Sequence, residues 1–71
     1  MKPVDGSITL NGQKVIIGLP CNVVRVLEKV GLKATQVVVE RNGMVLSRER
    51  LTETFLEDGD RLEVIVPVAG G

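Results

Sequence analysis

The sequence contains no histidine, tryptophan or tyrosine, and its 71 residues include a single cysteine, Cys21. With one thiol and no imidazole, the chain cannot form an internal disulfide, and the usual zinc ligand sets and thiol–imidazole pairs are not available to it. A phosphate-binding glycine loop is also missing, as is any plausible pair of a base and a nucleophile. The composition therefore makes an independent enzyme the weakest interpretation and argues against a metal site.

An excess of charge of either sign is missing as well. Lysine plus arginine number nine, and so do aspartate plus glutamate. Non-specific phosphate binding needs a basic field, so nucleic acid is not the favoured partner. Residues 1–7 contain no apolar run, and we therefore expect neither a signal peptide nor a membrane anchor. The protein is accordingly expected to be cytoplasmic.

Aromatic residues are almost absent, because Phe55 is the only one. The hydrophobic fraction is nevertheless 44%, and the candidates for the interior are nearly all valine, leucine and isoleucine, which argues against disorder. A chain of this length forms one domain and buries only about 60% of its unfolded surface. We expect an efficient aliphatic core with little room for an enclosed active site.

The first part of the chain is patterned as a β-hairpin. Residues 7–10 alternate in polarity and meet Asn11-Gly12, a strong hairpin signal, before the apolar run 15–17. Residues 18–20 then break the second strand. The residues predicted to face the core are Ile8, Leu10, Val15 and Ile17.

A helix is predicted next. Asn22 is a good N-cap and Gly31 a good C′ residue, and the residues between them are apolar at helical spacing. Leu32 is expected to pack beneath the end of this helix. The predicted apolar face consists of Val23, Val26, Leu27 and Val30.

The remaining chain is predicted to be mainly β. Residues 36–40 favour a strand. The second Asn-Gly pair, Asn42-Gly43, predicts a turn that connects this strand to a short partner strand at 44–46. Residues 47–57 are expected to form a loop with 3₁₀ or α character that buries Leu51, Phe55 and Leu56, with the charged residues 48–50 as solvated surface. After a turn at 57–60, residues 61–66 predict a strand that faces the core through Leu62, Val64 and Val66.

This order of elements predicts an α+β domain. One helix following a hairpin crosses one face of a mixed sheet of four to five strands, and the final strand lies beside the first, which is the β-grasp arrangement. We assign the domain to residues 1–66. Residues 67–71 are predicted to form a flexible tail.

The tail reads Pro-Val-Ala-Gly-Gly and ends at Gly71. Glycine has no Cβ, so Gly70 and Gly71 can lie extended in a channel too narrow for side chains, with the terminal carboxylate open to attack. Small residues also end many ordinary domains. What the tail is attached to must therefore decide its meaning.

Several segments, in this order, carry a resemblance to a known family. They are Asn11-Gly12, the helix end at 26–32, the strand and turn at 37–43, the segment 57–64, and the final Gly70-Gly71. In these the chain resembles the small sulfur carriers of the ThiS/MoaD family, in the ubiquitin-like β-grasp superfamily. It departs from typical thiamine carriers by about half a dozen residues before the first strand, and residues 67–71 also resemble the end of the molybdopterin synthase small subunit.

The resemblance implies a chemistry performed by other proteins. An adenylating enzyme of the ThiF/MoeB type uses ATP to join the Gly71 carboxylate to AMP, and sulfur from a persulfide, supplied by a cysteine desulfurase, then displaces AMP. The product is a thiocarboxylate for an acceptor such as thiazole synthase. The carrier binds no cofactor and no metal itself, and is expected to be monomeric when free. The tail expected to thread the partner's channel is Val68, Ala69, Gly70 and Gly71.

A partner surface is predicted on the open face of the sheet. Alternation places Ile16, Val38 and Ile65 there as an apolar cluster, and charges around it would set specificity. Scattered exposed aliphatic residues are also normal on small proteins, and we give the two interpretations equal weight. Cys21, just before the helix, is better explained as a small hydrophobic residue than as a reactive thiol. The rim charges are Glu40, Arg61 and Glu63.

Thiamine thiazole formation is the favoured pathway, with molybdopterin synthesis, tRNA thiolation and a cysteine-forming route left open because the same tail serves all of them. A second class is a ubiquitin-like modifier that forms isopeptide bonds through Gly71. A third is a non-covalent interaction module whose tail is incidental.

Overall fold

The computed structural model describes residues 4–67. Its strands and helices follow the order expected from the sequence, with a second short helix and two short strands in addition. The elements are β1 (Val4–Leu10), β2 (Gln13–Leu19), β3 (Cys21–Asn22), α1 (Val23–Lys29), a 3₁₀ turn η1 (Ala34–Gln36), β4 (Val38–Arg41), β5 (Met44–Leu46), α2 (Arg48–Glu53), β6 (Phe55–Leu56) and β7 (Arg61–Ile65).

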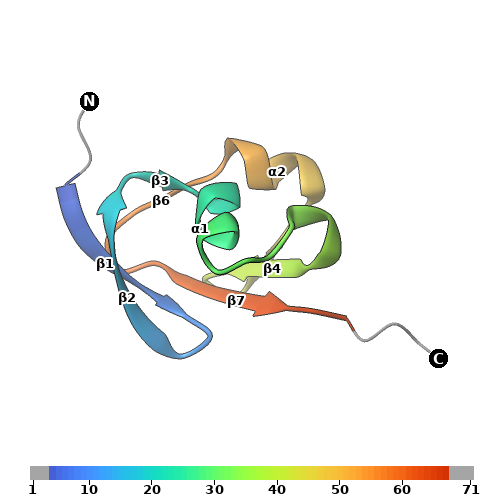
Figure 1. The fold of residues 1–71 in the computed structure, drawn as a ribbon, viewed down its shortest axis with the longest axis horizontal. Helices are drawn as coiled ribbons and strands as arrows, with labels where there is room; N and C mark the ends of the chain where they lie inside the picture. Colours follow the sequence, from blue (N-terminus) through green and yellow to red (C-terminus); the bar gives the residue numbers. More distant parts are fainter. Residues whose placement is uncertain (1–3, 68–71) are drawn as a thin grey trace.

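The main sheet has five strands in the order β2-β1-β7-β4-β5. Strand β7 pairs parallel with β1 and antiparallel with β4, so the last strand occupies the centre of the sheet. Both helices lie on the same side of the sheet, and its other face is left open (Figure 1). The predicted α+β β-grasp fold, with the final strand beside the first, is confirmed.

The core lies between α1 and the sheet. Side chains from α1 (Val23, Val26 and Leu27) pack against both hairpin strands and the central strands. A two-stranded sheet of β3 and β6 closes one end and adds Leu56, while α2 adds Leu51. The buried sheet residues are Ile8, Ile17, Leu19, Val39, Leu62 and Val64.

The predicted helix caps are confirmed. The Oδ1 atom of Asn22 accepts a hydrogen bond from the backbone N–H of Val24 at 2.9 Å, which is the N-cap interaction. The Nδ2 atom of Asn22 donates to the Thr52 carbonyl at 2.8 Å, so the same side chain ties α1 to α2. Gly31 follows the helix at φ +79°, a conformation that favours glycine.

Both Asn-Gly turns also hold the central strand, which the sequence pattern does not reveal. Asn11 and Asn42 have φ of 49° and 50°, and each directs its side chain at β7. Asn11 accepts from the Val64 N–H at 2.6 Å and donates to the Val64 carbonyl at 3.1 Å. Asn42 accepts from the Arg61 N–H at 2.9 Å. The two turns therefore fix β7 at two points along its length.

Replacing Asn11 with glycine is expected to destabilise the fold by about 1–3 kcal/mol, because two hydrogen bonds to Val64 are lost while the positive φ remains allowed. Urea unfolding followed by far-UV circular dichroism measures the loss, and faster hydrogen exchange at the Val64 amide localises it. Gln13→Ala, an exposed change in the same hairpin, is the matched control. Equal stability of N11G and wild type would show that these bonds contribute nothing.

Several predicted boundaries were wrong. Strand β1 begins at Val4, so residues 4–6, which were expected to precede the first strand, already belong to it. Strand β2 continues through Gly18 and Leu19, and Leu19 is buried. Strand β4 begins at Val38, because residues 34–36 form the 3₁₀ turn.

Three residues predicted to be buried are exposed. Phe55 and Leu56 are neighbours in β6, and successive strand residues face opposite sides, so only Leu56 points inward. Val30 is the C-cap of α1 and lies beyond the packed face. Val66 is 55% exposed because β7 ends one residue earlier. Within residues 4–67, no helix has the length and apolar character needed to cross a membrane.

Candidate docking face and tail exit

The chain leaves the sheet at the end of β7, and we call Val66 and Pro67, which follow this strand, the tail exit. Strand β7 runs out of the sheet at Ile65, and Pro67 is the last residue that the structure describes. In Figure 1 this end lies opposite the start of β1. The predicted tail residues Val68, Ala69, Gly70 and Gly71 lie outside the described residues, so the role assigned to them stays a prediction.

The open face carries the predicted surface residues in a defined register. Val38 lies opposite Ile65. Two residues further along each strand, and therefore on the same face, Glu40 lies opposite Glu63. Val45 of β5 extends this second row, because it pairs with Glu40. Val38 is 39% exposed and Ile65 is 49% exposed, so the two aliphatic side chains form a pair in contact with water next to the tail exit.

Ile16 does not belong to this pair. It is 62% exposed, as alternation predicts, but it lies opposite Ser7 on the hairpin. Ser7 is two residues before the Thr9–Arg61 pairing and Ile65 is four residues beyond it, so Ile16 and Ile65 are about 20 Å apart along the strands. The three residues predicted to form one cluster therefore lie at two separate sites, and of the three only Val38 and Ile65 adjoin the tail exit.

The row next to Val38–Ile65 is acidic. Directly opposed like charges on neighbouring strands destabilise a sheet. Arg61, on the same face of β7, is exposed and lies two residues from Glu63. Residues 4–67 contain one ion pair, between Arg41 and Asp60. Within this part of the chain, Glu40 and Glu63 therefore form no ion pair. A basic group of a partner would relieve their repulsion.

Asp60 organises the start of β7, and its role was not predicted. Its Oδ2 atom accepts from Arg41 Nε at 3.0 Å, Arg41 Nη2 at 2.8 Å and the Glu57 N–H at 2.9 Å. Its Oδ1 atom accepts from Asn42 Nδ2 at 3.0 Å. Burial alone raises the pKa of this carboxyl, but hydrogen bonds from Glu57, Asn42 and Arg41 and the charge of Arg41 lower it overall. Asp60 is therefore an ionised structural anchor.

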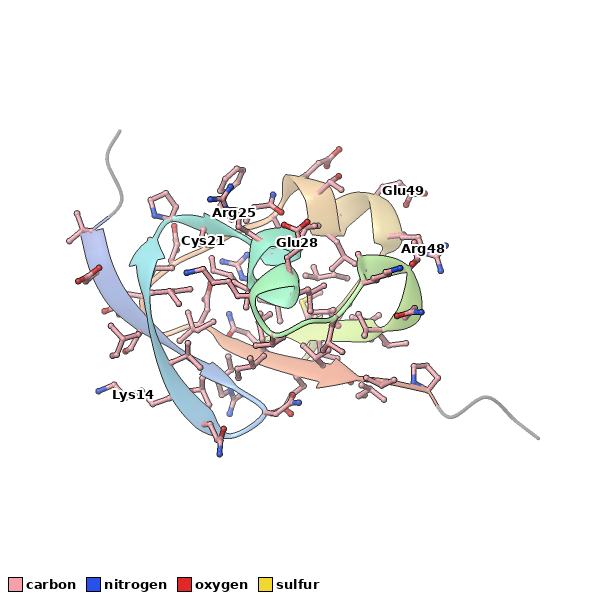
Figure 2. The ribbon with its side chains drawn as sticks, viewed as in Figure 1. Lys14, Cys21, Arg25, Glu28, Arg48 and Glu49 are labelled. Carbon is pink, nitrogen blue, oxygen red and sulfur yellow. The ribbon has the colours of Figure 1, made fainter. Side chains whose placement is uncertain are left out.

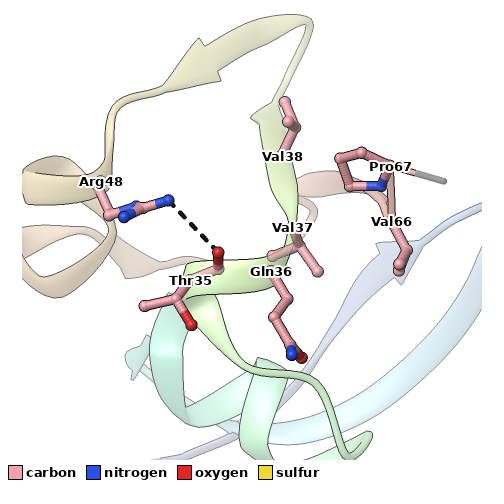
Figure 3. Close-up of a pocket in the computed structure, with 7 residues that line it drawn as sticks. All are labelled: Thr35, Gln36, Val37, Val38, Arg48, Val66 and Pro67. Carbon is pink, nitrogen blue, oxygen red and sulfur yellow. Dashed lines mark hydrogen bonds between the residues drawn. The ribbon is translucent and has the colours of Figure 1, made fainter. Parts of the chain in front are cut away.

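A groove of about 490 Å³ lies beside the tail exit, and we call it the tail-root groove. Figure 3 shows Val66 and Pro67 on one side and Arg48 on the other, with the chain before β4 between them. Arg48 Nη2 donates to the Thr35 carbonyl at 3.4 Å. The residues that line the groove are Thr35, Gln36, Val37, Val38, Arg48, Val66 and Pro67.

Other labelled side chains lie away from this end. In Figure 2, Arg48 is on the same side of the molecule as the end of β7, whereas Lys14 is on the hairpin at the opposite side. Cys21 is half-buried against the core, with Sγ 3.6 Å from the Asn22 carbonyl, as a small hydrophobic residue would be.

Comparison with known proteins decides the family, because the ThiS family profile matches residues 7–71, nearly the whole chain. The chain belongs to the ThiS family. The resemblance to β-grasp sulfur carriers that the sequence suggested is thereby confirmed. The match includes the two final glycines, which the structure does not describe.

Solved structures agree with the family assignment. A crystal structure of the thiamine biosynthesis protein ThiS from Geobacter metallireducens superposes with a TM-score of 0.77 at 35% identity, covering 92% of this chain and 99% of that one. The solution structure of a thiamine biosynthesis protein from the same organism gives a TM-score of 0.75 at 35% identity, covering 92% and 87%. An uncharacterized protein, ycf40, from Pyropia yezoensis is 34% identical over 65 residues, 92% of each chain.

The residues that sequence reasoning missed act through their side-chain bonds rather than through exposure. The positions of Asn11 and Asn42 were identified as turns, but a turn signal does not show that the asparagine side chain bonds to a distant strand. Arg48 was assigned to a solvated charge run; it is exposed as predicted, and it also lines the tail-root groove. Only the tertiary arrangement brings it to the tail exit.

Proposed function

We propose that the chain carries sulfur as a thiocarboxylate on Gly71 for formation of the thiamine thiazole. The observation that carries this proposal is the family match, which extends through the final Gly-Gly. The Geobacter relatives are thiamine biosynthesis proteins, which favours the thiazole pathway over the other sulfur routes. The carrier supplies the acyl group, and the partner enzymes supply the catalysis.

Formation of the thiocarboxylate takes three steps. In the first, a carboxylate oxygen of Gly71 attacks the α-phosphorus of ATP in the active site of a ThiF-type adenylating enzyme, and pyrophosphate leaves. In the second, a persulfide sulfur that originates from a cysteine desulfurase attacks the acyl carbon and displaces AMP. Reductive cleavage of the resulting S–S bond by a thiol leaves the thiocarboxylate, which gives its sulfur to thiazole synthase.

The described residues position this terminus. Because β7 is bonded to β1 and β4 and held by two asparagine side chains, the tail follows a strand that is supported on both sides. Val38 and Ile65 give the adenylating enzyme an apolar contact beside the exit, and Glu40 and Glu63 attract a basic group of that enzyme. Such contacts fix the direction in which the tail enters the partner's channel.

Intact mass spectrometry tests the proposal. The chain is incubated with a ThiF-type adenylating enzyme, ATP, Mg²⁺, a cysteine desulfurase, cysteine and a thiol reductant. We expect a mass gain equal to the exchange of one oxygen atom for one sulfur atom, localised to the C-terminal peptide. Omission of ATP is the control and should abolish the gain. An unchanged mass, with an enzyme that activates another ThiS protein in the same assay, would contradict the proposal.

The pathway is tested separately by transfer. The purified thiocarboxylate form is mixed with thiazole synthase and its substrates, and loss of the sulfur mass should coincide with formation of the thiazole. A carrier that is charged with sulfur but does not support thiazole formation would belong to another sulfur pathway.

A further inference from the structure

The tail-root groove leaves apolar surface in water next to the tail exit. Val37 is half-buried and Val66 is 55% exposed, and both lie just beyond the Val38–Ile65 pairing that ends the β4–β7 ladder. Pro67 follows directly and is exposed. The core does not bury this surface, so a partner that covers it gains hydrophobic free energy.

Among the described residues, Arg48 is the one charged residue that lines the groove. It is the first residue of α2, where a cation is unfavourable to the helix dipole. Its Nη2 contact with the Thr35 carbonyl is long, at 3.4 Å, and exposed. Helix stability therefore does not explain a cation at this position, and further N–H groups of the guanidinium are left to bind a carboxylate.

The position of the groove identifies what can reach it. Four residues follow Pro67, and a fully extended chain of that length spans at most about 14 Å. An enzyme that holds the Gly71 carboxylate in its active site must therefore approach within this distance of the groove. The adenylating enzyme is the partner that has to do so before any sulfur is transferred.

We propose that the tail-root groove binds an extended segment of the adenylating enzyme, with an aliphatic side chain against Val37 and Val66 and a carboxylate on Arg48. This inference rests on the proposed function and adds a second contact to the open face. Val38 belongs to both surfaces, so the two contacts are continuous around the end of β4.

The two surfaces differ in charge, and this sets the orientation of the partner. Beside the Val38–Ile65 pair the open face presents Glu40 and Glu63, with Arg61 two residues further from the tail exit, whereas the groove presents Arg48. A partner that covers both must carry a basic group on one side of the tail channel and an acidic group on the other. A reversed approach would bring like charges together, which is costly and thereby excludes wrong orientations.

Charge reversal of Arg48 tests the inference. Carrier-dependent exchange of pyrophosphate with ATP is measured at low salt with a ThiF-type adenylating enzyme, and KM and kcat are obtained for each carrier variant. We expect Arg48→Glu to raise KM by about tenfold or more, because a carboxylate then faces the partner's carboxylate. Arg48→Lys keeps the charge and should show a smaller increase in KM.

Arg50→Glu is the matched control, because Arg50 is exposed on the same helix and the change in net charge is the same. R50E should retain the wild-type KM. Urea unfolding checks that R48E folds, and we expect no loss of stability, since an acidic residue suits the first turn of a helix.

Three results would overturn the inference. If R48E and R50E share the wild-type KM while the wild type is active, the groove does not contact the enzyme and the proposed function still stands. If the wild type supports no exchange, the proposed function fails and the inference fails with it. If removing residues 68–71 from the free chain shifts the amide resonances of Thr35 and Val37, the groove holds the chain's own tail instead.

Discussion

A Gly70→Val variant is expected to form thiocarboxylate about 10²-fold more slowly than the wild type, because a displacement of about 1 Å at the reacting group is enough for such a loss. Valine adds a branched side chain next to the reacting residue, where the proposed channel admits only backbone. The rate is measured from the mass gain over time with the adenylating enzyme in excess, so that each carrier molecule is converted once.

Ala69→Gly is the matched control for this loss, because it changes the adjacent position by removing a methyl group and leaves the tail narrow. It should react at close to the wild-type rate. The thermal unfolding of all three proteins should coincide, since residue 70 lies beyond the domain assigned to residues 1–66. A G70V carrier that is charged as fast as the wild type would show that the partner's channel accepts side chains, and the interpretation of the diglycine would be wrong.

Removing the carboxylate of Asp60 is expected to have the largest effect on stability. Asp60→Ala loses four hydrogen bonds and leaves Arg41, Asn42 and the Glu57 N–H without their acceptor. Loss of a buried, hydrogen-bonded charge typically costs about 2–4 kcal/mol, which is a large part of the stability of a small domain. Urea unfolding at pH 7 measures the difference.

The pH dependence of this effect has a definite sign. The pKa of Asp60 is lowered below its ordinary value of 3.8 in the folded protein. The carboxylate therefore stabilises the fold above the unfolded pKa, and this contribution is lost as the pH falls from about 5 through the folded pKa. We expect the difference between wild type and Asp60→Asn to be full at pH 7 and to shrink steadily below pH 4.

Asp58→Asn is the control for both measurements. Asp58 lies in the same turn but is exposed, and it accepts one backbone hydrogen bond, from the Ser7 N–H at 2.7 Å. Its replacement should cost at most about 1 kcal/mol. If D58N and D60N lose equal stability, or if the loss in D60N is the same at every pH, the anchoring role of Asp60 is wrong.

The sequence was most informative where local signals agree with the fold. Asn22 and Gly31 bound the helix, the two Asn-Gly pairs mark the hairpin turns, and alternation identifies the inward residues of the central strands. Each of these features depends on residues only a few positions apart, so it can be read from a short stretch of sequence. The β-grasp order followed from them.

Long-range geometry was not accessible from the same signals. Alternation correctly predicted that Ile16, Val38 and Ile65 are exposed. The register between the strands separates Ile16 from the other two, and this register cannot be read from the pattern within one strand. The bonds of Asp60 to Arg41 and Asn42 and those of Asn11 to Val64 cross 18 residues or more of sequence, and the groove at Arg48 forms only when α2 packs beside η1. These features are therefore findings of the structure.

The central place of β7 has a consequence for how the protein is made. The N-terminal hairpin and helix emerge first during synthesis, but the strand that separates β1 from β4 is synthesised last. A chain that stops before residue 61 keeps β1 and β4 unpaired on their inner edges and cannot close its core. A chain truncated before β7 is therefore expected to stay incompletely folded and open to proteolysis.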